Sequence, residues 1–372
     1  MPHGCRVSIL VLYIRRGSAS QIFMRNPIFD IGKFVIMLFV VYGHIPHLYP
    51  KSFDPGMSYF SNLNIGMAMP FFFIVSGYFS ASSISSKVFK RLFSFLWPLF
   101  SFGVVIALSR YFVGEISFWK MLVYPVWQLF FGSWFLRTLA IIFLIHAIVW
   151  RFAPERFRCV VLLLIYGLLF FSPRNSVFFW TAQVMHMFPY FTFGIVVMQK
   201  RRCYDNSWVA VPAGILFLLT VVLEGNIRTN GMAFYWVSSD WRTVLNDSHL
   251  IFCFFARTIV GISGTIFFLW SLDKLLKLFP RLTSFAKFGT TTLGVYLLHE
   301  WPLVMVGKHF EINAMSVSVS LGLALVFLFA CHYVVICINS VSYIRNFFFG
   351  DYDRLKNSVM KCYKKIFVKE TL

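Results

Sequence analysis

Apolar stretches of nearly membrane-spanning length recur along the whole chain, and they limit the folds that are open to it. A transmembrane helix needs roughly 20 mostly apolar residues. With 59% hydrophobic and only 13% charged residues, the chain has more apolar surface than a soluble domain needs. We predict an all-α polytopic membrane protein with about ten transmembrane helices in one bundle. The predicted spans are 27–46, 65–83, 92–112, 134–150, 158–172, 184–198, 208–224, 250–271, 290–306 and 317–342.

The formal net charge of +20 follows the alternation of spans and connections. Lys and Arg residues gather on alternate connections, for example at 87–91 and 200–202, and in the C-terminal tail. Short loops rich in Lys and Arg stay in the cytoplasm. The pattern therefore predicts a multi-pass protein of the inner (cytoplasmic) membrane with both termini in the cytoplasm. Its expected partner is the lipid bilayer, and we expect no nucleic-acid partner.

Several well-known chemical motifs are absent from the sequence. It has no HxxxxD pattern, no GxSxG elbow, no P-loop and no GxGxxG turn. His299-Glu300 lacks the second histidine of a zinc-binding HExxH helix. The seven cysteines show no CxxC pair or metal-ligand spacing, so we expect no metal.

The chain divides into three parts by composition. Residues 1–24 hold a short apolar run between arginines, which is too short to span a membrane. This tail is either a translation start assigned too early, with Met24 as the true start, or a cytoplasmic amphipathic tail. We expect it to be dispensable. Residues 25–344 form the ten-helix membrane domain, and 345–372 form a basic cytoplasmic tail that anionic lipid would attract.

The first span carries three ionisable side chains, Asp30, Lys33 and His44. Such groups inside a membrane are costly and usually functional. Asp30 lies one helical turn before Lys33, where the two can pair. Lys33 and His44 are eleven residues apart, which is about three turns, so both share one face and lie roughly 16 Å apart along the axis. We predict that Asp30, Lys33 and His44 form the centre of a functional site.

Further polar side chains fall at membrane depth or at span ends. They are Ser76, Tyr78, Lys87, Lys90, Arg91, Trp134, Arg137, His299 and Glu300. Each also has a structural interpretation, since Ser and Tyr hydroxyls hydrogen-bond within helix bundles and arginines near helix ends extend toward the interface. These residues alone fit an enzyme, a secondary transporter or flippase for a lipid-linked sugar, or a membrane scaffold.

The ordered blocks of polar residues resemble the integral-membrane acyltransferase 3 family, which includes fucose-acetylase-like proteins and polysaccharide O-acetyltransferases. The first block holds Asp30, Lys33, and the run from Val40 to His44. The second is the Met-Pro-Phe-Phe-Phe-Ile-Val-Ser-Gly-Tyr run that ends at Tyr78. Lys90-Arg91 before Pro98, Trp134-Phe-Leu, and the stretch from Gly289 to His299 resemble later blocks. The resemblance covers about residues 25 to 342.

The resemblance implies an O-acyltransferase whose donor is cytoplasmic acetyl-CoA or another acyl-CoA and whose acceptor is a glycan hydroxyl. It implies His44 as general base or acyl carrier, with Lys33 held by Asp30. The cations expected to bind the donor are Lys87, Lys90 and Arg91. The residues expected on the substrate side are Ser76, Tyr78, Trp134, Arg137, His299 and Glu300.

Overall fold

The computed structural model describes residues 26–45, 64–81, 84, 87–171, 179–198, 203–223, 248–309, 316–353 and 357. Within these ranges the chain is helical or in short connecting turns and contains no β-strand. The all-α prediction is therefore confirmed for the described residues. The N-terminal tail at 1–24 and most of the C-terminal tail lie outside them.

Helices occupy all ten of the stretches predicted from the sequence. In chain order they are α2 (Pro27–His44), the π-helix η2 (Asn64–Ala68) with α4 (Met69–Ser80), α5 (Val88–Phe112), α7 (Trp134–Phe152), α8 (Arg158–Phe170), α9 (Phe179–Phe193) with the π-helix η5 (Gly194–Met198), α11 (Ser207–Leu223), α14 (Ser248–Leu278), α16 (Thr292–His309) and α17 (Val317–Ser340). Between and after them lie α6 (Phe118–Phe131), η3 (Glu155–Phe157), η6 (Cys203–Asp205), η7 (Pro280–Phe285), α15 (Ala286–Gly289) and α18 (Ser342–Phe349).

Six of the described helices are long and apolar enough to cross a membrane. Their spanning parts are Pro27–His44, Val88–Phe112, Trp134–Phe152, Thr181–Met198, Phe255–Leu278 and Val317–Ser340. The helix α8 has only 13 residues, a length of about 20 Å against an apolar membrane core of roughly 30 Å. The protein is thus a multi-pass membrane protein, but the count of about ten spans is not confirmed.

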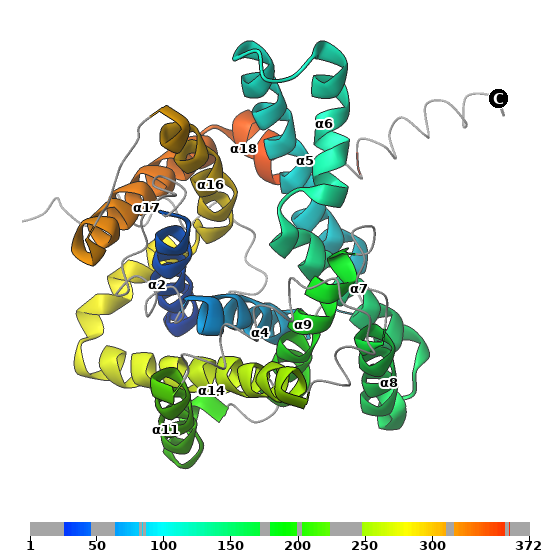
Figure 1. The fold of residues 1–372 in the computed structure, drawn as a ribbon, viewed down its shortest axis with the longest axis vertical. Helices are drawn as coiled ribbons and strands as arrows, with labels where there is room; N and C mark the ends of the chain where they lie inside the picture. Colours follow the sequence, from blue (N-terminus) through cyan, green and yellow to red (C-terminus); the bar gives the residue numbers. More distant parts are fainter. Residues whose placement is uncertain are drawn as a thin grey trace, which may run out of the picture.

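The helix α2 lies in the middle of the fold, between α16 and α17 on one side and α4 and α14 on the other (Figure 1). Its start is fixed locally, because the Asn26 side chain accepts a hydrogen bond from the backbone N–H of Ile28 at 3.1 Å, and Pro27 occupies the first turn. Ile36, Val40 and other residues of α2 are fully buried. These apolar side chains of α2 form part of the core of the bundle.

A close crossing joins α4 to the end of α9 and the start of η5. Gly77 of α4 lies against the Phe191 carbonyl, and Gly194 of η5 lies against the Ile74 carbonyl. A methyl group on either glycine would overlap the facing backbone. Small residues are what let membrane helices approach this closely. The crossing fixes the helix that carries Ser76 and Tyr78.

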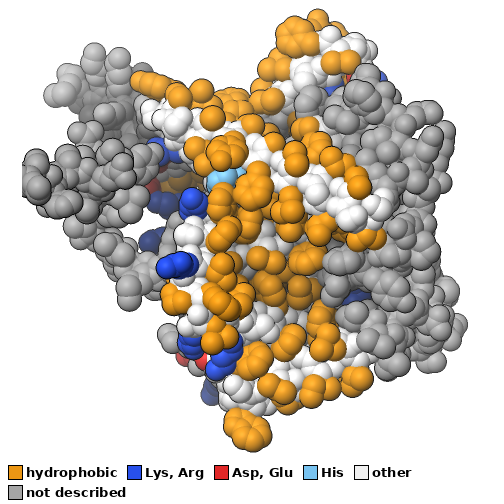
Figure 2. Space-filling view, turned by 90° about the vertical axis from the view of Figure 1, so that its left-hand side faces the viewer, with side chains coloured by type: hydrophobic (Ala, Val, Ile, Leu, Met, Phe, Trp, Pro, Cys, Tyr) orange, Lys and Arg blue, Asp and Glu red, His pale blue; other side chains and the backbone are white. Residues whose placement is uncertain are grey.

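The outer surface carries many apolar side chains. Figure 2 shows, on the α17 side of Figure 1, that the described part of this face carries many hydrophobic side chains, with Lys and Arg gathered along one side. On α17 the exposed apolar residues include Val319, Val326 and Val334. Such a face suits contact with lipid tails rather than water.

The short helix α18 packs against α5. The Trp97 indole N–H donates to the Phe347 carbonyl and the Ser101 hydroxyl donates to the Phe348 carbonyl, each at 2.8 Å. The predicted boundary between membrane domain and tail, at 344/345, falls inside α18. The start of the expected tail is therefore a docked helix.

We expect Gly77→Ala to lower the melting temperature of the detergent-solubilised protein, because the added methyl group meets backbone atoms that cannot move independently. Overpacking of this kind costs about 1–3 kcal/mol. The matched control is Gly322→Ala in α17, where the space around the glycine is open. Equal melting temperatures for the two variants, measured by tryptophan fluorescence, would contradict the prediction that the crossing stabilises the fold.

Candidate functional site

The predicted pair between Asp30 and Lys33 forms in the first turns of α2. The Lys33 Nζ lies 2.9 Å from Asp30 Oδ1, and it also lies over the Phe79 ring at 5.4 Å from the ring centroid. Asp30 is buried and Lys33 is half-buried. Gly289 of α15 lies against the Asp30 backbone so closely that a larger residue would clash with it. The short helix α15 therefore covers the start of α2 beside the pair.

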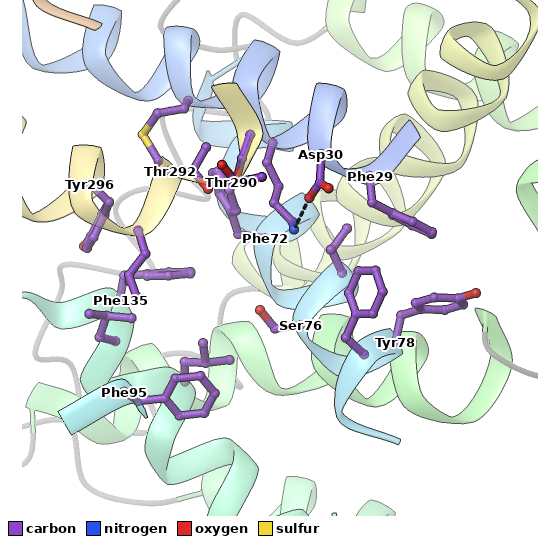
Figure 3. A pocket seen from close by; sticks show the side chains of 18 of the residues that line it. Phe29, Asp30, Phe72, Ser76, Tyr78, Phe95, Phe135, Thr290, Thr292 and Tyr296 are labelled. Atoms are coloured by element: carbon purple, nitrogen blue, oxygen red, sulfur yellow. Dashed lines mark hydrogen bonds and ion pairs between the residues drawn. The ribbon is translucent and has the colours of Figure 1, made fainter. Parts of the chain in front are cut away.

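A cavity of about 880 Å³ opens beside this pair. That volume lies within the usual range for small-molecule sites. Figure 3 shows Tyr296 and Phe135 on one side of the cavity and Phe29 and Tyr78 on the opposite side, with the Asp30–Lys33 pair between them. The polar residues that line the cavity are Asn26, Asp30, Lys33, Ser76, Tyr78, Arg91, Ser94, Tyr204, Thr290, Thr292 and Tyr296.

Arg91 is a second cation in the cavity lining. Its guanidinium lies over the Phe95 ring at 5.4 Å, and its buried Nε makes no hydrogen bond within the described part of the chain. A buried guanidinium N–H without a partner is costly unless a ligand accepts it. Lys87 and Lys90 are exposed and do not line the cavity, and Lys90 pairs instead with Asp353.

The His44 and His299 rings contact each other where α2 ends beside α16. His299 Nε2 lies 3.3 Å from His44 Nδ1, and the ring centroids are 4.8 Å apart. His299 is buried and His44 is half-buried. Neither ring lines the cavity, but the Tyr296 ring does, and its centroid is 5.8 Å from that of His299. A chain of ring contacts therefore joins the cavity to His44.

The remaining predicted site residues divide between the cavity and other surroundings. Ser76 and Tyr78 line the cavity. Trp134 packs on Phe135, with ring centroids 6.3 Å apart, and does not line the cavity. Arg137 donates to the Gln183 side chain at 2.9 Å and does not line the cavity. Glu300 is exposed and outside the cavity lining.

Comparison with known proteins identifies a family for this chain. The family described as an acyltransferase domain matches residues 26–339, which is most of the 372-residue chain. The chain belongs to the acyltransferase 3 family. It is therefore a membrane acyltransferase, as the resemblance predicted. The comparison with curated proteins and the comparison with solved structures each found no match.

Several residues that line the cavity of this acyltransferase had no predicted role, notably Asn26, Thr290, Thr292 and Tyr296. Three consecutive threonines at 290–292, at the start of the predicted span 290–306, were a usable signal. Tyr296 lay inside a recognised block but had no assigned role. Within the described residues, no group of three His, Cys, Asp or Glu side chains could hold a metal ion.

We expect Lys33→Met to destabilise this acyltransferase because it leaves the buried Asp30 carboxylate without its partner. Breaking a buried pair costs up to about 3–5 kcal/mol. Lys33→Arg keeps the charge and should keep both stability and most activity. The control is Lys120→Met on α6, where the lysine is exposed. Thermal unfolding in detergent measures the difference.

The double variant of Asp30→Asn with Lys33→Met separates pairing from any further role of Lys33. It removes both charges, so stability should recover. Activity that returns together with stability would show that Lys33 serves only Asp30. A stable but inactive double variant would show that Lys33 also acts on a substrate.

Proposed function

We propose that this acyltransferase transfers an acyl group, most simply acetyl, from a cytoplasmic acyl-CoA to a hydroxyl group of a cell-surface sugar or polysaccharide. The observation that carries the proposal is the cavity, whose lining includes the two cations Lys33 and Arg91 as well as Tyr296. Tyr296 contacts His299, and His299 contacts His44. A cationic donor site is thus connected to a histidine further along the same helix.

The cations that line the cavity suit the binding of a phosphate group. Arg91 has an unsatisfied N–H there, and arginine binds phosphate oxygens through strong charge-assisted hydrogen bonds. Lys33 adds a second positive charge, although Asp30 already neutralises part of it. The cavity lining includes Asn26, Arg91 and Thr290, which lie at the helix starts where the charge pattern predicts the cytoplasmic face. Coenzyme A is available on that side of the membrane.

The orientation of the His44 ring suits a base. Its Nδ1 lies 2.8 Å from the Val40 carbonyl oxygen. A carbonyl oxygen only accepts, so Nδ1 carries a hydrogen and Nε2 holds the lone pair of the neutral ring. Nε2 can then take the proton of the acceptor hydroxyl, a role typically worth roughly 10²–10⁴-fold in rate.

The acyl group can pass from CoA to the acceptor hydroxyl by either of two routes. With His44 as base, the acceptor oxygen bonds to the thioester carbon, the carbon–sulfur bond breaks, and the departing CoA thiolate takes the proton from the imidazolium. With His44 as acyl carrier, Nε2 itself attacks the thioester carbon and CoA leaves as the thiolate. The acceptor oxygen then takes the acyl group from the ring, and its proton ends on the sulfur. Both routes give a sugar ester and free CoA.

We expect His44→Ala to abolish acyl transfer while leaving the protein folded, since the half-buried ring at the end of α2 contributes little packed volume. Wild type should hydrolyse acetyl-CoA slowly in detergent without any ion gradient, and the variant should not. Mass spectrometry of surface glycans should show ester groups only in cells that carry the wild type. A fully active His44→Ala protein would exclude His44 from the chemistry.

Binding of a cytoplasmic acyl-CoA beside Lys33 requires that this end of α2 faces the cytoplasm. We expect alkaline phosphatase fused after residue 200 to be inactive, because the basic connection there is predicted to be cytoplasmic. Fused after residue 235, it should be active. The opposite pattern, at equal expression of both fusions, would place the Lys33 end of α2 on the outer side and overturn the proposed donor.

A further inference from the structure

The contact between His44 and His299 joins residues that lie far apart in the chain. His299 Nε2 faces His44 Nδ1 at 3.3 Å, and the two ring planes are nearly perpendicular at 83°. His299 is almost completely buried, with 1% of its surface exposed. A buried imidazole needs hydrogen-bond partners for its nitrogens, so those partners indicate which nitrogen carries the hydrogen.

Backbone contacts fix where the hydrogens lie on both rings. His44 Nδ1 is 2.8 Å from the Val40 carbonyl oxygen, and His299 Nδ1 is 2.8 Å from the Tyr296 carbonyl oxygen. Both Nδ1 atoms are therefore donors. In neutral His299 the Nε2 atom is then an acceptor, and it points at the Nδ1–H of His44. The His44 N–H is shared between the Val40 oxygen and His299.

We propose that His299 is a positioning residue for His44. It fixes the His44 ring in the tautomer whose Nε2 is basic, and it accepts the Nδ1–H more strongly once Nε2 has bound a proton or an acyl group. This inference rests on the proposed function, in which Nε2 of His44 reacts. The arrangement has the logic of a catalytic triad, where the group behind the histidine holds its tautomer and stabilises its charged form.

A neutral acceptor suits this position better than a carboxylate. The contact lies within a membrane bundle and His299 is buried, where an extra charge is expensive to desolvate. Tyr296, one turn earlier on α16, is held in turn by the Ser133 hydroxyl, which donates to the Tyr296 Oη at 2.8 Å. The turn of α16 that presents His299 is thus tied to the start of α7.

The test compares His299→Gln with His299→Met. The two side chains are similar in length, but only glutamine offers an oxygen to the His44 N–H. We expect His299→Met to lower kcat by about 10- to 100-fold with little change in the KM for acetyl-CoA, a size typical for the loss of an orienting partner. His299→Gln should recover much of kcat. Equal kcat for Gln and Met variants, or a full-rate Met variant, would overturn the inference.

The matched control is His146→Leu. His146 is also buried, its Nδ1 also meets the carbonyl one turn earlier, and its Nε2 meets Thr192 rather than another histidine. Its loss should lower the melting temperature without a selective loss of kcat. If His299→Met does not fold, His299→Phe keeps the ring and removes the acceptor, and it is compared with His299→Gln in the same way.

Two further results separate this inference from the proposed function. If His44→Ala is active, the proposed chemistry fails whatever His299 does. If His44→Ala is inactive while His299→Met works at full rate, only the positioning role fails.

Discussion

A lysine and an aspartate one turn apart can both lie within an apolar bundle because each neutralises the other. The ion pair between Asp30 and Lys33 keeps two charges near the start of α2, where Gly289 of α15 lies against the Asp30 backbone. Because α15 then covers α2 directly, the threonines that follow it reach the same cavity. Gly289 thus lets α15, and the threonines after it, lie beside the pair.

Close backbone approach joins α4 to the end of α9. Gly77 and Gly194 let α4 cross the end of α9 with backbone against backbone. In a membrane, apolar side chains gain little from meeting each other rather than lipid, so tight packing at small residues has to hold helices together. Ser76 and Tyr78, on either side of Gly77, are held at the cavity by that crossing.

Aromatic rings connect the cavity with the histidine pair. Tyr296 lines the cavity, contacts Phe135 at 5.1 Å between ring centroids, and lies one turn before His299. Through His299, Tyr296 links the cavity in which the proposed donor would bind to His44. If the proposed thioester donor binds in the cavity, these rings would shield it from water and keep its hydrolysis in detergent slow.

The sequence by itself determined the helices, the ion pair and the family. Apolar length marked the ten helical stretches, helical spacing placed Asp30 beside Lys33, and the order of blocks indicated an acyltransferase. These features depend on residues close together in the chain, so local periodicity reveals them.

Only the tertiary structure decided which distant residues meet. Of the three predicted donor cations it brings Arg91 alone to the cavity, and it adds Thr290 and Tyr296. It pairs His299 with His44, although 255 positions separate them. Helix packing sets these contacts, and packing depends on the shapes of side chains over the whole bundle rather than on any spacing that one sequence displays.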